Sequence, residues 1–256
     1  MANKILEINN LVTEFISDNN SVKAVNNVSF SIQENEIVGV VGESGSGKSV
    51  TSLSAMGLIP SPPGKITNGE ILFTKKNGET INILNLSPKE LKNIRGKEMS
   101  MIFQEPMTSL NPVFTCGNQV TEALMLHEKL SKSEAKIKAI ELLKQVELPR
   151  PEEIFKQYPH QISGGQKQRV MIAMAISCNP KLLIADEPTT ALDVTVQKTI
   201  LNLLKYIQEE TKMGILFITH DLGVIAELAD KIVVMYKGKV VEQGFVKDIF
   251  NNPQHP

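Results

Sequence analysis

Eight consecutive residues, Gly42 to Ser49, combine the residue types that bind phosphate groups. They read Gly-Glu-Ser-Gly-Ser-Gly-Lys-Ser and fit the pattern G-x-x-x-x-G-K-[ST]. Glycines lack a Cβ atom, so successive backbone N–H groups can turn inward around an anion. The lysine adds positive charge for the β and γ phosphates, and the last serine can ligate Mg²⁺. The candidate phosphate-binding residues are Gly42, Glu43, Ser44, Gly45, Ser46, Gly47, Lys48 and Ser49.

The flanks of this loop predict the setting that the pattern requires. Residues 36–41 read as a buried strand, and residues 50–56 can follow as a helix. A helix that begins at the loop would direct the positive end of its dipole at the anion. The alternative is a plain Gly/Ser-rich turn between a strand and a helix. The strand, loop and helix together favour nucleotide binding.

A pair of carboxylates and a histidine follow two later strands. Residues 181–186 form an apolar run that ends in Asp186 and Glu187, and residues 214–219 form another that precedes His220. A strand-end Asp beside a phosphate loop can hold Mg²⁺, and a neighbouring Glu can deprotonate an attacking water. In open α/β sheets ligands bind at the carboxyl ends of the strands, where His220 could hydrogen-bond the γ-phosphate. The alternative for all three is a solvated group at a strand end.

Composition excludes several classes of protein. The 256 residues carry a formal net charge of −1, so no global basic field points to nucleic acid. No run of 18 apolar residues predicts a membrane span. Cys116 and Cys178 lie far apart without a C-x-x-C pair, which favours buried thiols over a metal site. We expect a cytosolic chain, or one peripheral to the cytoplasmic face of a membrane.

The order of elements predicts an α/β fold. The first 40 residues alternate with period two, and residues 69–74 and 81–84 flank a turn as a hairpin. A capping box at Ser131 opens a helix with the apolar stripe Ile137, Ile140, Leu143 and Val146. We therefore expect a single domain, 1–256, with a mostly parallel core sheet and an antiparallel β subdomain (1–104 and 161–256). A helical subdomain would be inserted at 105–160.

A second Gly/Ser loop, Ile162-Ser-Gly-Gly-Gln-Lys-Gln-Arg169, also opens a predicted helix. With this loop the sequence resembles the ABC ATPases, whose motifs occur here in the family's order over almost the whole chain. The resemblance implies that Phe15 stacks on adenine, that Gln104 contacts Mg²⁺ with Ser49 and Asp186, and that Asp193 belongs to the D-loop formed by residues 191–193. It also implies that Glu187 is the catalytic base and His220 the switch histidine, with Lys48 neutralising developing charge. The implied covering loop comprises Ser163, Gly164, Gly165 and Gln166.

Three positions depart from the family's usual residues. Ile162 replaces leucine, a change that conserves volume. Val50 follows the loop serine where Thr or Ser is common, so it contributes a backbone N–H without a side-chain donor. Phe15 can stack but cannot donate a hydrogen bond as Tyr or Trp would. None of these changes predicts an inactive site.

The resemblance implies an ATP- and Mg²⁺-dependent ATPase that works as a head-to-tail dimer. The covering loop of one ATPase subunit would close over ATP held by the other. The segments 103–112, 185–197 and 252–256 resemble the ATPases of oligopeptide, dipeptide and nickel importers. The implied partners are a second ATPase subunit, two membrane-spanning permease subunits and, indirectly, an extracellular substrate-binding protein. The alternatives are a nickel or metal-chelate importer, an exporter, and a soluble ABC ATPase that acts on DNA or ribosomes.

Overall fold

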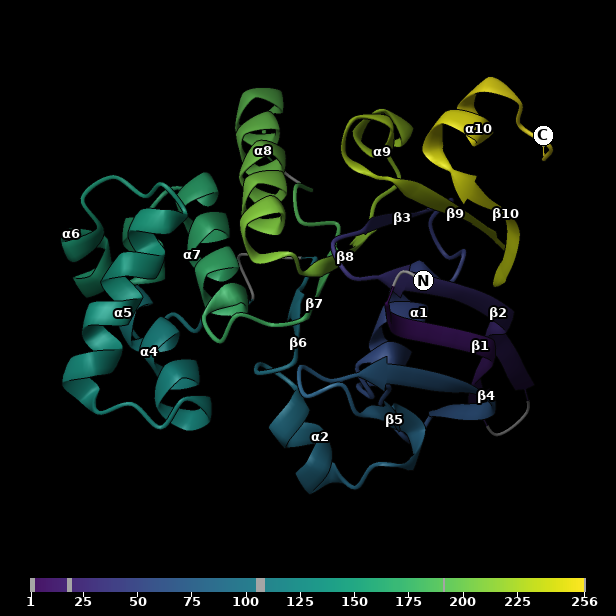
Figure 1. Cartoon of the computed structure of the whole chain (residues 1–256), viewed down its shortest axis with the longest axis horizontal. Helices are drawn as coiled ribbons and strands as arrows, with labels where there is room; N and C mark the ends of the chain where they lie inside the picture. Colours follow the sequence, from purple (N-terminus) through teal and green to yellow (C-terminus); the bar gives the residue numbers. More distant parts are fainter. Residues whose placement is uncertain (1–2, 18–19, 105–108, 191, 256) are drawn as a thin grey trace. The chain divides into compact units, whose positions relative to one another are not determined.

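The structure is a computed structural model that describes residues 3–17, 20–104, 109–190 and 192–255. Residues 105–108 and Ala191, which belong to motifs named above, lie outside the described residues. The chain divides into two compact units, residues 1–92 with 212–256 and residues 93–211. Figure 1 shows the elements of both units coloured along the sequence.

The first unit contains an antiparallel sheet that is built mainly from the N-terminal residues. Its strand order is β2-β1-β4-β5, with β1 at Lys4–Ser17, β2 at Asn20–Gln33, β4 at Gly64–Thr74 and β5 at Thr80–Asn82. Alternate side chains Val28, Phe30 and Ile32 of β2 are buried, which confirms the period-two prediction there. The prediction is wrong for β1, which buries the consecutive residues Ile5 and Leu6 and the run 11–13, because its register with β2 shifts at several points. The hairpin expected around residues 75–78 is also confirmed, because β4 and β5 pair in antiparallel fashion.

One detail of this hairpin was predicted wrongly. Ile83 and Leu84 do not extend the second strand but lie in a 3₁₀ turn, η1 at Ile83–Asn85. The Asn82 side chain accepts a hydrogen bond from the Leu84 backbone N–H at 3.1 Å. Asparagine side chains compete with strand pairing in this way. The turn therefore begins at Ile83, although the apolar residues Ile83 and Leu84 alone predict a strand.

The rest of the first unit is an α/β layer. Strand β3 (Ile37–Val41) is buried along its length, and it pairs in parallel with β8 (Gly214–Ile218) and β9 (Lys231–Tyr236). Strand β10 (Lys239–Phe245) pairs antiparallel with β9. The helices are α1 at Lys48–Ala55, α9 at Leu222–Leu228 and α10 at Val246–Asn251, while α2 at Pro88–Ile94 crosses the boundary of the units. Burial on both faces explains the continuous apolar runs.

The second unit combines two parallel strands with helices. Strands β6 (Met99–Ile102) and β7 (Leu182–Asp186) pair in parallel. Helices α4 (Cys116–His127), α5 (Lys132–Gln145), α6 (Pro151–Lys156) and α7 (Gly164–Ile176) gather together, as the teal and green coils in Figure 1 show. The 3₁₀ turn η2 (Pro159–Gln161) precedes α7, and α8 spans Val194–Thr211. The helical subdomain at 105–160 stays a prediction, since the compact unit that contains these helices also includes β6, β7 and α8.

The capping box of α5 is confirmed, but its predicted apolar stripe is partly wrong. Ser131 and Glu134 cap each other's backbone N–H groups. The buried face consists of Ala135, Ala139, Leu142 and Leu143, whereas the Ile137 side chain is 61% exposed. The small residues Ala135 and Ala139 form part of the buried face. A prediction based only on the large apolar residues therefore does not find this face. Within the described residues, none of the helices has both the length and the hydrophobicity to cross a bilayer.

Candidate functional site

The loop between β3 and α1 has a left-handed backbone that favours glycine at two points. Gly47 is the N-cap of α1 with φ 99°, and Gly45 has φ 78°. A Cβ atom at Gly47 would collide with the carbonyl oxygen of Ala24. The Ser46 backbone N–H donates to the Glu43 carbonyl at 3.1 Å, which closes the turn. The predicted strand, glycine loop and helix are therefore confirmed, and we refer to residues 42–49 as the phosphate loop.

Two polar side chains inside the phosphate loop fit an anion. Lys48 is 6% exposed, and its Nζ donates to the carbonyl oxygens of Gly42 at 2.7 Å and Glu43 at 3.0 Å. The ammonium group thus bends back over the loop rather than into solvent. The Ser46 hydroxyl is buried and has no hydrogen-bond partner among the residues that the structure describes. An unsatisfied buried hydroxyl costs about 1–3 kcal/mol, and a phosphate oxygen is a partner that would satisfy it.

The other predicted residues of the first unit lie on three elements. Ser49 and Val50 are half-buried in the first turn of α1, and Phe15 is half-buried on β1 opposite Gly64. His220 is exposed directly after β8. Because β3 and β8 are parallel neighbours, the phosphate loop and His220 both lie at the carboxyl ends of these strands. Asp221 is the N-cap of α9, since its carboxylate accepts the N–H groups of Gly223 and Val224.

The predicted carboxylates and Gln104 all belong to the second unit. Strand β7 buries Asp186 to 4% exposure and ends there. Glu187 then adopts φ 46°, so the alternation of the strand does not extend to it. Strands β6 and β7 run in parallel, which brings Gln104 to the same end as Glu187. The Gln104 Nε2 donates to Glu187 Oε2 at 3.2 Å. Sequence reasoning placed both residues in a phosphate site but did not foresee their direct contact.

The second glycine loop forms a helix N-terminus with its own capping box. Ser163 is the N-cap of α7, and its Oγ accepts the Gln166 backbone N–H at 3.3 Å. The Gln166 Oε1 accepts the Ser163 backbone N–H at 2.9 Å. A Cβ atom at Gly165 would lie 2.8 Å from a methyl carbon of Val196. Asp193 is exposed, and its carboxylate caps the start of α8 by accepting the Val196 N–H at 2.9 Å.

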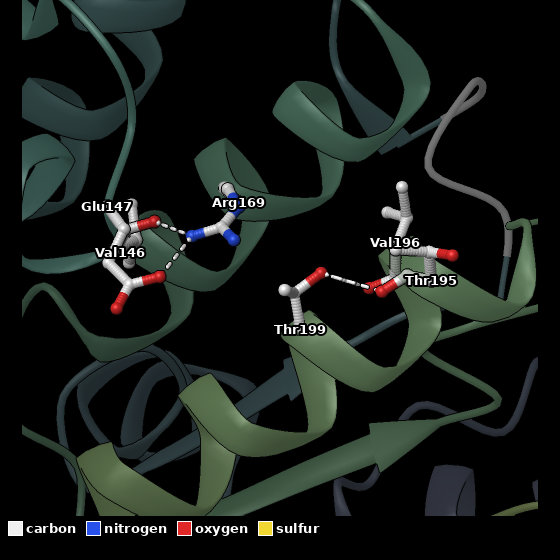
Figure 2. A network of polar contacts seen from close by, with 6 residues as sticks. All are labelled: Val146, Glu147, Arg169, Thr195, Val196 and Thr199. Atoms are coloured by element: carbon white, nitrogen blue, oxygen red, sulfur yellow. Dashed lines mark hydrogen bonds and ion pairs between the residues drawn. The ribbon is translucent and has the colours of Figure 1, made fainter.

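The helix that follows this loop is tied to the helical part of the same unit. Arg169 of α7 donates to the backbone carbonyl of Val146 at 2.6 Å and to the Glu147 carboxylate at 3.1 Å. Figure 2 shows the guanidinium group pointing at both acceptors. The Arg169 side chain is only 15% exposed, and hydrogen bonds to ionised groups in such places are among the stronger ones. This contact fixes α7, and with it the Ser163–Gln166 loop, against the end of α5.

Two polar contacts of the second unit were not predicted from the sequence. The Thr190 hydroxyl donates to Glu187 Oε2 at 2.9 Å. Gln119 is 7% exposed and holds the segment after residue 110: its Oε1 accepts the Asn111 N–H, and its Nε2 donates to the carbonyls of Asn111 and Phe114. For the contact between Thr190 and Glu187, the sequence offers one signal, a hydroxyl residue three positions after the glutamate. Nothing in the spacing of Gln119 indicates its contacts.

Both cysteines are buried, as the sequence predicts. Burial raises the pKa of the Cys116 thiol to about 11, so this group is protonated at neutral pH and is no nucleophile. In the part of the chain that the structure describes, no cluster of three or more His, Cys, Asp or Glu side chains is suited to hold a metal ion. A Mg²⁺ bound to phosphates needs only one or two protein ligands beside water.

Comparisons with known proteins agree with this geometry. A family model described as ABC transporter matches residues 25–190. The oligopeptide transport ATP-binding protein OppD of Bacillus subtilis is 53% identical over 253 residues, which cover 99% of this chain and 69% of that protein. The glutathione import ATP-binding protein GsiA of Escherichia coli is 51% identical over 255 residues, covering 100% of this chain and 41% of that protein. The chain thus spans less than half the length of the latter relative.

Solved structures match the fold as well. A dimeric ATP-binding cassette in a post-hydrolysis state, bound to ADP and Pi, superposes with a TM-score of 0.81 at 31% identity, covering 94% of this chain and 99% of the other. The structure of cbiO1 from Clostridium perfringens, part of an ABC transporter complex, superposes with a TM-score of 0.79 at 27% identity, covering 98% of this chain and 92% of the other. The expected α/β class, with an antiparallel N-terminal sheet and parallel core strands, is confirmed.

Proposed function

Because the chain belongs to the ABC transporter family, we propose that it is the ATP-binding and ATP-hydrolysing subunit of an importer. The observation that carries the proposal is the phosphate loop. There the buried Ser46 hydroxyl lacks a partner within the described part of the chain, and the Lys48 ammonium is held over the loop. Both features fit the phosphates of ATP. The relatives named for oligopeptide and glutathione import support peptides as the cargo. A nickel or metal-chelate importer is the alternative.

The roles of the individual residues are part of the proposal. Residues 42–50 hold the phosphates, and Phe15 stacks on adenine. Bound Mg²⁺, held by Ser49, Gln104 and Asp186, would supply positive charge to the β and γ phosphates. Glu187 orients and deprotonates the attacking water, and His220 hydrogen-bonds the γ-phosphate. Lys48 neutralises charge that develops in the transition state.

We also propose that the site is completed by a second ATPase subunit. Residues 163–166 lie at the N-terminus of the 13-residue helix α7, where backbone N–H groups and the helix dipole favour an anion. In this proposal the loop covers ATP held by the partner, and Asp193 lies beside it. The structure of a dimeric relative bound to ADP and Pi supports a dimeric mode of action.

The proposed membrane partner has a candidate docking surface on α4. A groove of about 660 Å³ is lined by Phe114, Met125 and Leu126, with Glu122 and Lys132 at its border. Phe114 is 52% exposed and Leu126 is 54% exposed. Exposed apolar side chains with a polar border are typical of a site for an amphipathic helix. We propose that a cytoplasmic segment of a permease subunit binds here, which would place the chain at the cytoplasmic face of the membrane.

Two measurements test the proposal. The purified chain should bind ATP, and Lys48→Ala should weaken binding by at least about tenfold, since a charge-assisted contact is lost; wild-type affinity in that variant would contradict the assignment. Tagged wild-type chain should co-purify with integral membrane subunits identified by mass spectrometry, whereas Leu126→Glu should not. Recovery of ribosomes or DNA instead would favour the soluble ABC ATPase.

A further inference from the structure

The backbone around Glu187 places a hydroxyl group next to its carboxylate. Glu187 leaves strand β7 with φ 46°, and the Thr190 backbone N–H donates to the Glu187 carbonyl at 3.2 Å. This turn brings the Thr190 side chain back toward Glu187, so that its Oγ1 reaches Glu187 Oε2 at 2.9 Å. Two residues of one short turn are therefore joined through both backbone and side chain. A left-handed backbone in a glutamate is uncommon, and residues with such backbones are enriched at functional sites.

The same carboxylate oxygen accepts a second hydrogen bond, from Gln104 Nε2 at 3.2 Å. The two donors differ in how firmly they are placed. Thr190 is half-buried and fixed within the turn of Glu187 itself, whereas Gln104 is exposed and 83 positions away in the sequence. A short β-branched side chain also loses less rotational freedom than a glutamine on making a contact. If Gln104 takes another partner, Thr190 still holds the carboxylate.

We propose that Thr190 is a positioning residue that aims the Glu187 carboxylate at the attacking water. The inference rests on the proposed role of Glu187 as the base of ATP hydrolysis. A general base must lie within hydrogen-bond reach of the proton it removes, and a displacement of about 1 Å can reduce the rate by about 100-fold. Thr190 makes no contact with the substrate in this account. Its loss therefore lowers kcat and leaves nucleotide affinity unchanged.

The test compares Thr190→Val, which keeps the shape but lacks the hydroxyl, with Thr190→Ser, which keeps the hydroxyl. ATP turnover is measured on the chain together with its partner ATPase and permease subunits. Thr190→Val should lower kcat by about tenfold, the value of a hydrogen bond to an ionised group, with KM unchanged. Thr190→Ser should restore most of the lost rate. Equal turnover in wild type and Thr190→Val, or equal losses in both variants, would overturn the inference.

Thr199→Val is the matched control. Its hydroxyl donates only within α8, to the carbonyls of Thr195 at 3.0 Å and Val196 at 2.8 Å (Figure 2), and the residue is exposed. This variant should keep wild-type turnover. In a Glu187→Gln background, Thr190→Val should cause no further loss, because the two residues act through one step. If Glu187→Gln itself keeps full turnover, the role of Glu187 fails; if only Thr190→Val is silent, the positioning role alone fails.

Discussion

Replacing Gly47 by alanine tests whether the phosphate loop is built as described. The residue has φ 99°, a region where an L side chain costs about 1–3 kcal/mol. A Cβ atom there also collides with the Ala24 carbonyl oxygen, and relief requires a backbone shift of about 1 Å. Overpacking of this kind adds about 1–3 kcal/mol. We therefore expect Gly47→Ala to lose about 2–6 kcal/mol in urea unfolding and to bind ATP at least about tenfold more weakly.

Gly78 provides the control for this substitution. It has φ 85°, and apart from its own chain neighbours no atom of the described residues lies within 4 Å of a Cβ built there. Gly78→Ala should therefore lose only about 1–3 kcal/mol of stability, the backbone part of the effect, and should bind ATP like the wild type in calorimetry. If Gly47→Ala matches Gly78→Ala in both unfolding and ATP affinity, the close approach of Ala24 does not shape the loop, and our reasoning about it is refuted.

Three further outcomes follow from local contacts. Ser131→Ala should lower the unfolding free energy in urea by about 1 kcal/mol, because the N-cap of α5 is lost. The Ser131 hydroxyl lowers the pKa of Glu134, so this pKa should rise in an NMR titration of the variant. An unchanged pKa would contradict the capping contact. Gln119→Leu should lose about 2 kcal/mol of unfolding free energy and make residues 111–114 more sensitive to protease, because the side chain no longer holds this segment. Equal rates of cleavage in the variant and the wild type would contradict this role of Gln119. Burial raises the pKa of the Cys116 thiol to about 11 in the folded state. The stability that this group contributes is therefore fully present below a pH of about 9 and is lost as the pH rises toward 11. Cys116→Ser should make this loss of stability smaller, which is measured as the urea midpoint at a series of pH values.

The sequence predicts best the features whose cause is local. The phosphate loop follows from glycines placed between an apolar strand and a helix, and the α5 cap follows from Ser131 and Glu134 three positions apart. The strand assignment of Ile83 and Leu84 fails because the Asn82 side chain takes a backbone N–H of the next turn. The stripe through Ile137 fails because Ala135 and Ala139 share the buried face of α5 with Leu142 and Leu143, while Ile137 points to solvent.

The polar contacts of the site depend on tertiary placement and could not be read from spacing. Gln104 and Glu187 are 83 positions apart and meet because β6 and β7 run in parallel. The orientation of Lys48 toward two loop carbonyls depends on the turn geometry that the glycines permit. Thr190 reaches Glu187 because Glu187 adopts a left-handed backbone, which no residue type at that position would suggest.

The most direct test of the proposed function is ATP turnover and ATP binding by Glu187→Gln, measured side by side with the wild type. The amide keeps the size of the carboxylate and can still accept the hydrogen bonds of Gln104 and Thr190, but it cannot accept a proton from water. We predict unchanged ATP affinity, a loss of turnover of at least about 100-fold, and an ATP-dependent dimer that persists in light scattering. Undiminished turnover in this variant would contradict the account.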